Sequence, residues 1–363
     1  MSPHQIVFLL GRRDEPTDAV EEYCEHLSAH LAPLGFETIL RRVPWEKHGW
    51  SQSLEALKLQ AQTWRGVWVA VQYTALAWSR RGFPSRFQKV LDILSAAGAR
   101  VSVVFHDVEP YEGNRLVDKL RRRVQVRTMR AALATSEKSV TTVDPHVLSW
   151  RPSPSAKLAF IPVGANLPPI DLIAESPIHP STGKLTIGVF SITGGAAGDR
   201  EAQTIVAATQ AAAHDLGPLR LSIFGREADK RRQFIQDALK GFPVEVSVDG
   251  VVTGEAIIER LRAADVLLFV RGILSTRRSS AIAGIACGLP LIAFRGNETA
   301  APITEAGVLL VQPFHQPEID AALLRLLRDS GLRSALAERS RIAQRKYFSW
   351  PAIAAKFAEL FRS

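Results

Sequence analysis

Short, continuous apolar runs recur along the chain and predict β-strands that are buried on both faces of a parallel sheet. The first half has such runs at residues 5–10, 66–73 and 100–106, and further strands are predicted at residues 36–43 and 140–143. Segments with helical spacing of apolar positions separate several of these runs. This succession of strand and helix predicts a parallel sheet that is covered by helices.

The predicted helices of the first half carry start and stop signals. Asp18 is placed to cap a helix that ends at Gly35, and Ser85 is placed to cap a helix that runs to Ala97. A further helix is predicted over residues 117–132.

The pattern changes between residues 150 and 183, which are rich in proline and serine and contain one short apolar run. This composition is typical of a linker between domains. The alternation then restarts, with a helix expected over residues 200–214 and strands at residues 185–190, 220–225, 244–250, 265–270 and 307–311. We therefore predict two Rossmann-like domains, residues 1–165 and 166–345, and a final helix, residues 346–363, that packs back on the first domain.

Length and composition agree with a folded, two-domain protein. The chain has 363 residues, of which 46% are hydrophobic, and a mean hydropathy of +0.03. Its two cysteines, Cys24 and Cys287, form no disulfide framework, which favours a reducing compartment. The first residues lack the pattern of a signal peptide, and the longest apolar stretch, residues 281–294, is too short to span a bilayer. We therefore expect a cytoplasmic protein.

The net charge of +9 favours an anionic partner, such as a membrane surface, a phosphorylated small molecule or a nucleic acid. One predicted helix carries a basic face, which is either simply solvated or docks on anionic lipid headgroups. We expect no nucleic-acid partner, because no binding motif and no interleaved aromatic residues accompany the charge. The basic face consists of Lys119, Arg122, Arg123, Arg127 and Arg130.

The segment RGILSTRRSSAIAGIACGLPLIAF, residues 271–294, follows a predicted strand and contains a helix of small residues. Ligands bind at the carboxyl ends of parallel strands, where helix N-termini attract anions. We expect the helix to begin near residues 275–277 and to lie close to the sheet. Serine hydroxyls and two guanidiniums at its start then suit a phosphate, since arginine binds phosphate bidentately. The simpler interpretation is a serine-capped helix with solvated arginines.

Other polar residues also follow predicted strands. Gly194 and Gly195 lie in a glycine-rich loop that is either a ligand-binding loop or a flexible surface loop. Arg226 is either a site residue or a surface arginine, and His106 either contacts a substrate or only bonds to a loop. No metal-ligating spacing and no D-x-D pair occurs, so we predict neither a metal nor a cofactor.

Several of these stretches together resemble glycosyltransferase family 4, a group with the GT-B fold. IPVGANL at residues 161–167 is similar to the family's crossover turn, and AGIACGLPLIAF resembles its E-A-M-A-C-G-x-P-V-I-A motif. RGNETAAPITEAGVLLV resembles G-G-x-P-E-x6-G-L-L-V, and YFSWPAIAAKFAELF at residues 347–361 is similar to the closing F-S-W helix. The resemblance covers most of the chain and is tighter from residue 157 onward.

The resemblance implies a GT-B enzyme that transfers a sugar from a nucleotide-sugar to a sugar-containing or other acceptor, with retention and without a metal. His106 is implied to face the transferring sugar. The residues implied for the donor diphosphate are Arg200, Ser275, Arg277, Arg278, Ser279 and Ser280. Those implied for the nucleotide or sugar are Gly194, Gly195, Arg226, Val251, Val252, Gly272 and Glu298. Acceptor contacts are expected from residues 11–16 and 72–78.

The sequence departs from the family at one motif. The family's E-x7-E pair holds the donor sugar and ribose, but Ser275 and Ala283 occupy these positions here. A subset of the family has a sequence of the S-x-R-R-x-S type at this point, which residues 275–280 resemble. The loss of both carboxylates motivates an alternative, a non-catalytic protein that binds a nucleotide-sugar or a partner.

Overall fold

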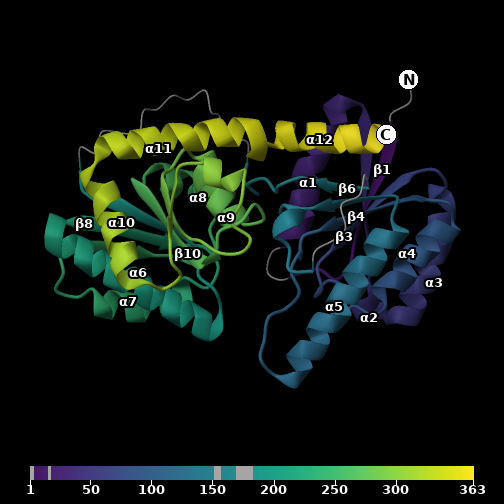
Figure 1. The fold of residues 1–363 in the computed structure, drawn as a ribbon, viewed down its shortest axis with the longest axis horizontal. Helices are drawn as coiled ribbons and strands as arrows, with labels where there is room; N and C mark the ends of the chain where they lie inside the picture. The colour runs from purple at the N-terminus through teal and green to yellow at the C-terminus, as the bar shows by residue number, and fades with distance from the viewer. Residues whose placement is uncertain (1–3, 15–17, 151–156, 169–182) are drawn as a thin grey trace. The chain divides into compact units, whose positions relative to one another are not determined.

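The structure is a computed structural model that describes residues 4–14, 18–150, 157–168 and 183–363. The chain divides into two compact units (Figure 1). The N-terminal unit contains Met1–Val163 and Trp350–Ser363, and the C-terminal unit contains Gly164–Ser349. Much of the predicted linker, residues 151–156 and 169–182, lies outside the described residues.

A parallel six-stranded sheet forms the centre of the N-terminal unit, in the order β2-β1-β3-β4-β5-β6. The central strand β3 is buried along its whole length, as its apolar sequence predicts. The strands are β1 (His4–Leu10), β2 (Phe36–Arg42), β3 (Trp68–Tyr73), β4 (Arg100–Phe105), β5 (Lys138–Thr141) and β6 (Leu158–Phe160).

Helices cover this sheet, and the predicted cap of the first one is confirmed. The Asp18 carboxylate accepts hydrogen bonds from the backbone N–H groups of Val20 and Glu21. The predicted cap at Ser85 is wrong, because the fourth helix begins after Arg86 without a side-chain cap. The helices are α1 (Ala19–Leu31), α2 (Trp45–His48), α3 (Trp50–Ala61), α4 (Phe87–Ala96), α5 (Leu116–Thr135) and α12 (Trp350–Arg362).

The last helix of the chain, α12, packs in the N-terminal unit beside α1 (Figure 1). The Trp68 indole N–H donates to the Phe361 carbonyl at 2.8 Å, a bond buried in the protein. The Trp350 ring packs against Tyr23, with 5.3 Å between ring centroids, and stacks on His26 at 5.2 Å. These contacts attach the C-terminal helix to α1 and to β3, which come early in the chain.

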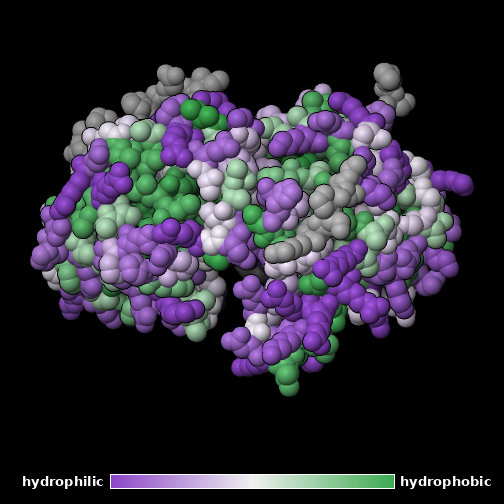
Figure 2. Space-filling view, in the orientation of Figure 1, coloured by the Kyte–Doolittle hydropathy of each residue, from purple (hydrophilic) through white to green (hydrophobic). Residues whose placement is uncertain are grey.

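Helix α5 presents an exposed polar face along most of its length, but its first turn has hydrophobic residues at the surface. Leu116 is 85% exposed, at the end of the helix that is lowest in the view of Figure 1. Figure 2 shows hydrophobic surface at this end, next to hydrophilic residues of the same helix. The first turn of α5 therefore exposes large aliphatic side chains, which are usually buried.

The C-terminal unit is built on a second parallel sheet, in the order β12-β11-β10-β7-β8-β9. Its core includes Ile187, Leu221, Leu268 and Ile292, which are fully buried. The strands are β7 (Leu185–Phe190), β8 (Leu219–Phe224), β9 (Val244–Val248), β10 (Val266–Ile273), β11 (Leu291–Phe294) and β12 (Val308–Val311). The helices are α6 (Gly195–Leu216), α7 (Arg232–Ala238), α8 (Gly254–Arg262), α9 (Ser279–Ala286), α10 (Gln316–Arg328) and α11 (Ser330–Ala343).

Two helix starts in this unit differ from the prediction. Helix α6 begins at Gly195, five residues before the predicted start at Arg200, so the glycine-rich loop is already part of its first turn. Helix α9 begins at Ser279 rather than near residues 275–277, because the Arg278 N–H bonds to the Ser275 carbonyl in a separate turn. Of the described helices, none is long and apolar enough to cross a membrane.

Candidate anion-binding site

The carboxyl edge of the C-terminal sheet has unusual backbone geometry. Ser191, Glu227 and Phe314 have φ of 69°, 63° and 58°, which is uncommon for residues other than glycine. They follow β7, β8 and β12, and no other non-glycine residue in the described ranges has a positive φ. Strained residues of this kind cluster at functional sites, so this edge of the sheet is a candidate ligand site.

The glycine-rich loop after β7 is held firmly in place. The Thr193 N–H donates to the buried Glu201 carboxylate at 2.7 Å, and the buried Arg231 guanidinium donates to the Gly195 carbonyl at 3.0 Å. A Cβ atom at Gly198 would lie 1.8 Å from the Thr193 carbonyl oxygen, so only glycine fits there. Gly194 and Gly195 are exposed at the N-terminus of α6, where free backbone amides favour an anion.

Strand β10 ends irregularly and brings arginines to the same edge. Its pairing with β11 shifts register between Phe269 and Ile273, and Gly272 within this irregularity has a φ of +71°. A Cβ atom at Gly272 would lie 3.2 Å from a guanidinium nitrogen of Arg278. The prediction that α9 lies close to the sheet is confirmed, because a Cβ atom at Gly284 would lie 2.4 Å from the Leu267 side chain.

Arg277 forms a two-pronged ion pair with Glu298. Its Nε and one terminal nitrogen each donate to one Glu298 oxygen at 2.7 Å, and Glu298 is buried. Burial raises the pKa of Glu298, but the hydrogen bonds and charge of Arg277 and the charge of Arg278 outweigh this effect, and the net pKa is lowered. Glu298 is therefore ionised, and it fixes the orientation of Arg277.

Arg278 and Arg271 are cations that the protein holds at a cost. Burial lowers the pKa of Arg278 to about 10, and the neighbouring charges of Arg277 and Arg271 add to this effect. Burial also lowers the pKa of Arg271, as does the positive charge of Arg226, while Glu201 opposes both.

The hydrogen-bonding capacity of these two guanidiniums is largely unused. Arg278 donates from Nε to the Ile273 carbonyl at 3.2 Å, and that is its single side-chain hydrogen bond within the described parts of the chain. The Arg271 side chain makes none with any described residue. Both guanidiniums stay charged at neutral pH, so this edge carries positive charge and open donors that suit an anion.

The structure brings most predicted donor residues to this edge, with different exposures. Ser275 is fully buried, and its hydroxyl forms no hydrogen bond with a described residue, so it does not face solvent. Ser280 is 9% exposed, and Ser279 is half-buried at the start of α9. Arg226 follows β8 and lies near enough to Arg271 to lower its pKa.

The remaining donor predictions fall at the two ends of this edge. Arg200 is in the second turn of α6, and its guanidinium carbon lies 4.9 Å from the centre of the Phe314 ring. Val251 follows β9 and is 58% exposed, while Val252 is half-buried. An exposed valine beside β9 offers an apolar contact, but it is not part of the arginine cluster, which consists of Arg271, Arg277 and Arg278.

In the N-terminal unit, His106 does not have the properties of a general acid. Its Nε2 lies 2.8 Å from the Gln72 amide oxygen, which can only accept, so Nε2 carries the proton. The imidazole packs edge-on against Tyr23, with ring centroids 4.9 Å apart. Burial lowers the pKa of His106 to about 4, although Asp18 opposes this effect. His106 is therefore neutral at physiological pH.

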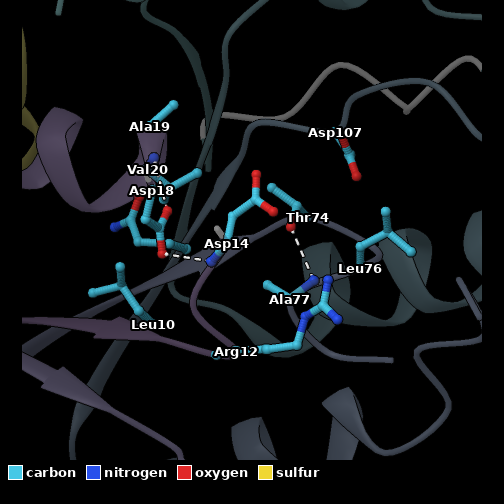
Figure 3. Close-up of a pocket in the computed structure, with 12 residues that line it drawn as sticks. Leu10, Arg12, Asp14, Asp18, Ala19, Val20, Thr74, Leu76, Ala77 and Asp107 are labelled. Carbon is cyan, nitrogen blue, oxygen red and sulfur yellow. Dashed lines mark hydrogen bonds between the residues drawn. The ribbon is translucent and has the colours of Figure 1, made fainter. Parts of the chain in front are cut away.

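The carboxyl edge of the N-terminal sheet has a cavity of about 200 Å³ (Figure 3). It lies between the loop after β1 and the loop after β3, and it is lined by residues that include Arg12, Asp14, Thr74 and Asp107. The Ala75 N–H donates to an Asp107 oxygen at 2.8 Å, which orients this carboxylate. These are the two loops from which acceptor contacts are expected, although residues 15–16 lie outside the described ranges.

Two residues at this edge, Arg271 and Glu201, were not predicted as site residues. Arg271 was passed over because a strand was expected to end at Val270, whereas β10 continues to Ile273. Glu201 was missed because its position in α6 suggests an exposed residue, but it is 3% exposed. A usable signal for Arg271 is the Arg-Gly pair at the end of an apolar strand, since glycine there permits a bulge.

Within the described ranges, no group of three or more His, Cys, Asp or Glu side chains could hold a metal ion. The absence of a required metal stays a prediction.

No protein-family model matches the sequence, and no curated protein matches it. Solved structures are similar over the whole chain. Sucrose-phosphate synthase from Thermosynechococcus elongatus has a TM-score of 0.69 at 18% identity, over 99% of this chain and 98% of that protein. HepE from Anabaena, solved with UDP and glucose, has a TM-score of 0.66 at 13% identity, over 99% of each chain. A glycosyltransferase from Rickettsia africae ESF-5 has a TM-score of 0.68 at 15% identity, over 100% of this chain and 98% of that protein. The chain therefore has the predicted GT-B fold, with two Rossmann-like units built on parallel sheets.

Proposed function

We propose that the protein is a glycosyltransferase of the family 4 type that moves a sugar from a nucleotide-sugar to an acceptor. The observation that carries the proposal is the arginine cluster at the carboxyl edge of the C-terminal sheet. Arg271 and Arg278 are half-buried cations with unused donors, and Arg277 is held in a fixed orientation by Glu298. A diphosphate supplies the negative charge and the acceptor oxygens that this arrangement lacks.

The proposed donor site uses both helix N-termini at this edge. One phosphate lies at the start of α9, where Ser279 and Arg278 face it, and the amides of Gly194 and Gly195 at the start of α6 receive the other. The base lies toward β9, where Val251 and Val252 offer apolar contacts. This assignment follows the strand order, because β10, β7, β8 and β9 are successive neighbours in the sheet.

The proposed chemistry needs no protein carboxylate as nucleophile. As the bond between the anomeric carbon and the diphosphate breaks, negative charge grows on the phosphate oxygen, and guanidiniums already in place stabilise it. In a retaining reaction of this type, the leaving phosphate accepts the proton of the acceptor hydroxyl. Neutral His106 then serves as a hydrogen-bonding contact for the sugar and not as a general acid, because its pKa is near 4.

The acceptor is proposed to bind at the carboxyl edge of the N-terminal sheet. The cavity there combines carboxylates and a guanidinium with the Thr74 hydroxyl, groups that pair well with sugar hydroxyls. HepE, which has the same fold, was solved with UDP and glucose, and this also supports a sugar-handling role.

The test is a turnover assay with a panel of nucleotide-sugars, in which release of the free nucleoside diphosphate is measured with and without candidate sugar acceptors. We expect release with at least one donor. The double substitution Arg277→Ala and Arg278→Ala should lower kcat by at least tenfold, because it removes charge that stabilises the leaving group. Full activity in the double variant would exclude the proposed site.

The alternative, a non-catalytic protein that binds nucleotide-sugars, is favoured by one observation. Ser275 and Ala283 replace the glutamate pair of the resembling family, and both side chains are buried. A non-catalytic protein of this kind would bind a nucleotide-sugar in a way that depends on Arg278, but it would show no turnover with any donor in the panel. The two outcomes separate the enzyme from the binding protein.

A further inference from the structure

The N-terminal end of α5 has an exposed apolar cluster. Leu116 is 85% exposed, Leu120 is 54% exposed and Val117 is 46% exposed, all within the first two turns of the helix. Tyr111, just before the helix, is 51% exposed and lies under the Arg121 guanidinium at 4.6 Å. Exposing three neighbouring aliphatic side chains is unfavourable in water, so this cluster has the character of a contact surface.

The basic face of α5 lies directly beside this cluster. Helical spacing places Lys119, Arg123 and Arg127 on the same side as Leu116 and Leu120, at i+3 and i+4 intervals. All three cations are exposed, and none forms an ion pair with a described residue. They line a groove of about 590 Å³ together with Arg122, Val126 and Arg130.

Two arginines of this face are held by the protein, which orients the groove. Arg122 donates to the Ser149 hydroxyl at 3.4 Å, and Arg130 donates to the Trp150 carbonyl at 2.9 Å. The surface of α5 therefore combines exposed cations that form no ion pair with a described residue and exposed aliphatic side chains.

We propose that α5 docks the protein on a membrane that contains anionic lipids, with Leu116, Val117 and Leu120 inserted among the lipids. Lys119, Arg123 and Arg127 then contact lipid phosphates. Two independent observations carry this assignment, the exposed aliphatic cluster and the charge complementarity of the unpaired cations. The proposal goes beyond sugar transfer and does not depend on it.

A lipid surface fits both halves of the surface better than other anions do. A nucleic acid pairs with the cations, but leaves three aliphatic side chains in water, since base stacking uses aromatic groups. An acidic protein surface pairs with the cations in the same way, yet needs an apolar patch of matching shape. At a bilayer, the interface accepts aliphatic side chains while the headgroups supply the negative charge.

The test is sedimentation of the full chain with vesicles of pure phosphatidylcholine and with vesicles that contain 30 mole per cent phosphatidylglycerol. We expect binding to the anionic vesicles alone at low salt, with a decrease at high salt. The triple variant Lys119→Glu, Arg123→Glu and Arg127→Glu should lower partitioning at least a hundredfold, at about fivefold for each charge removed. Leu116→Asp should lower it at least tenfold, because it removes an inserted aliphatic side chain and adds a negative charge.

Two matched control variants separate local docking from general charge or exposure. The variant Lys58→Glu, Lys89→Glu and Lys240→Glu makes the same charge change at exposed positions outside α5. Leu59→Asp changes an aliphatic residue that is 68% exposed on α3. Both should bind vesicles nearly as well as the unaltered protein.

Three results would overturn the proposal. One is equal binding to both kinds of vesicle or to neither. Another is a loss in the lysine control as large as in the α5 variant, which would indicate only net charge. The last is self-association in solution that Leu116→Asp abolishes without any vesicle binding, which would assign the cluster to contact between copies of the chain. Circular dichroism of each variant confirms that loss of binding is not loss of folding.

Discussion

Replacement of Arg278 by glutamine should change stability and ligand binding in opposite directions. Burial and like charges lower the pKa of this guanidinium to about 10, well below its ordinary value. Because one pKa unit corresponds to about 1.4 kcal/mol, the unliganded protein holds this cation at a cost of about 3 kcal/mol. Glutamine removes the charge but also the hydrogen bond to the Ile273 carbonyl, which contributes about 1 kcal/mol.

The net effect on the unliganded protein is therefore a gain of about 2 kcal/mol in the free energy of unfolding. For a unit of this size, that gain raises Tm by about 5 °C. Binding of a nucleoside diphosphate should weaken by tenfold to a hundredfold, since a hydrogen bond between charged groups contributes about 1.5–3 kcal/mol. Calorimetric unfolding, with and without ligand, measures both quantities in one experiment.

Arg325→Gln is the matched control, because Arg325 is exposed on α10 in the same unit. It should alter neither Tm nor nucleotide affinity. A loss of stability in Arg278→Gln would mean that Arg278 holds the fold together, and unchanged affinity would mean that it does not face the ligand. Either result would refute the reasoning from burial and charge.

Three further substitutions test neighbouring parts of the account. Gly198→Ala should destabilise the protein by about 2 kcal/mol and abolish nucleotide-dependent stabilisation, because its Cβ would meet the Thr193 carbonyl; retained nucleotide stabilisation would contradict this. Glu298→Gln should cost about 3 kcal/mol of unfolding free energy, measured with denaturant, since it leaves Arg277 without its buried partner, and a neutral result would count against the ion pair. The pKa of His106 is about 4 in the folded protein and 6.5 in the unfolded chain. Between these pH values the unfolded chain binds one more proton than the folded protein does. Acidification from pH 7 to pH 4 should therefore remove up to about 3 kcal/mol of the free energy of unfolding. His106→Gln should lack this component, and identical pH profiles of stability for the two proteins would contradict the lowered pKa.

The strands could be predicted from sequence because buried parallel strands require uninterrupted apolar runs. Residues 185–190 coincide with β7. Residues 36–43 exceed β2 by a single residue, although polar residues interrupt that segment and the strand is only partly buried. Helices α2 and α3 were not predicted, because Gly49 interrupts the segment and few of its side chains are buried. The formation of α2 and α3 therefore depends on tertiary packing, which a local sequence pattern does not show.

The site was predicted in part, for a reason of the same kind. The arginines of residues 277–278 were identified because they stand between a strand and a helix of small residues. Glu298 was expected to contact the nucleotide or sugar, whereas it pairs with Arg277, and Glu201 was not identified. Both carboxylates come from other parts of the unit and are brought close only by the sheet order. Ser275 was expected to face a ligand but is buried, because the turn after β10 directs it inward.

The central claim is that the carboxyl edge of the C-terminal sheet binds the diphosphate of a nucleotide. Isothermal titration calorimetry with a nucleoside, its monophosphate and its diphosphate tests this claim most directly, for each of the common bases. The account predicts that, for the preferred base, affinity rises at each added phosphate by tenfold or more and that Arg271→Gln together with Arg278→Gln removes this rise. Equal affinity for the nucleoside and its diphosphate, or a rise that survives in the double variant, would contradict it.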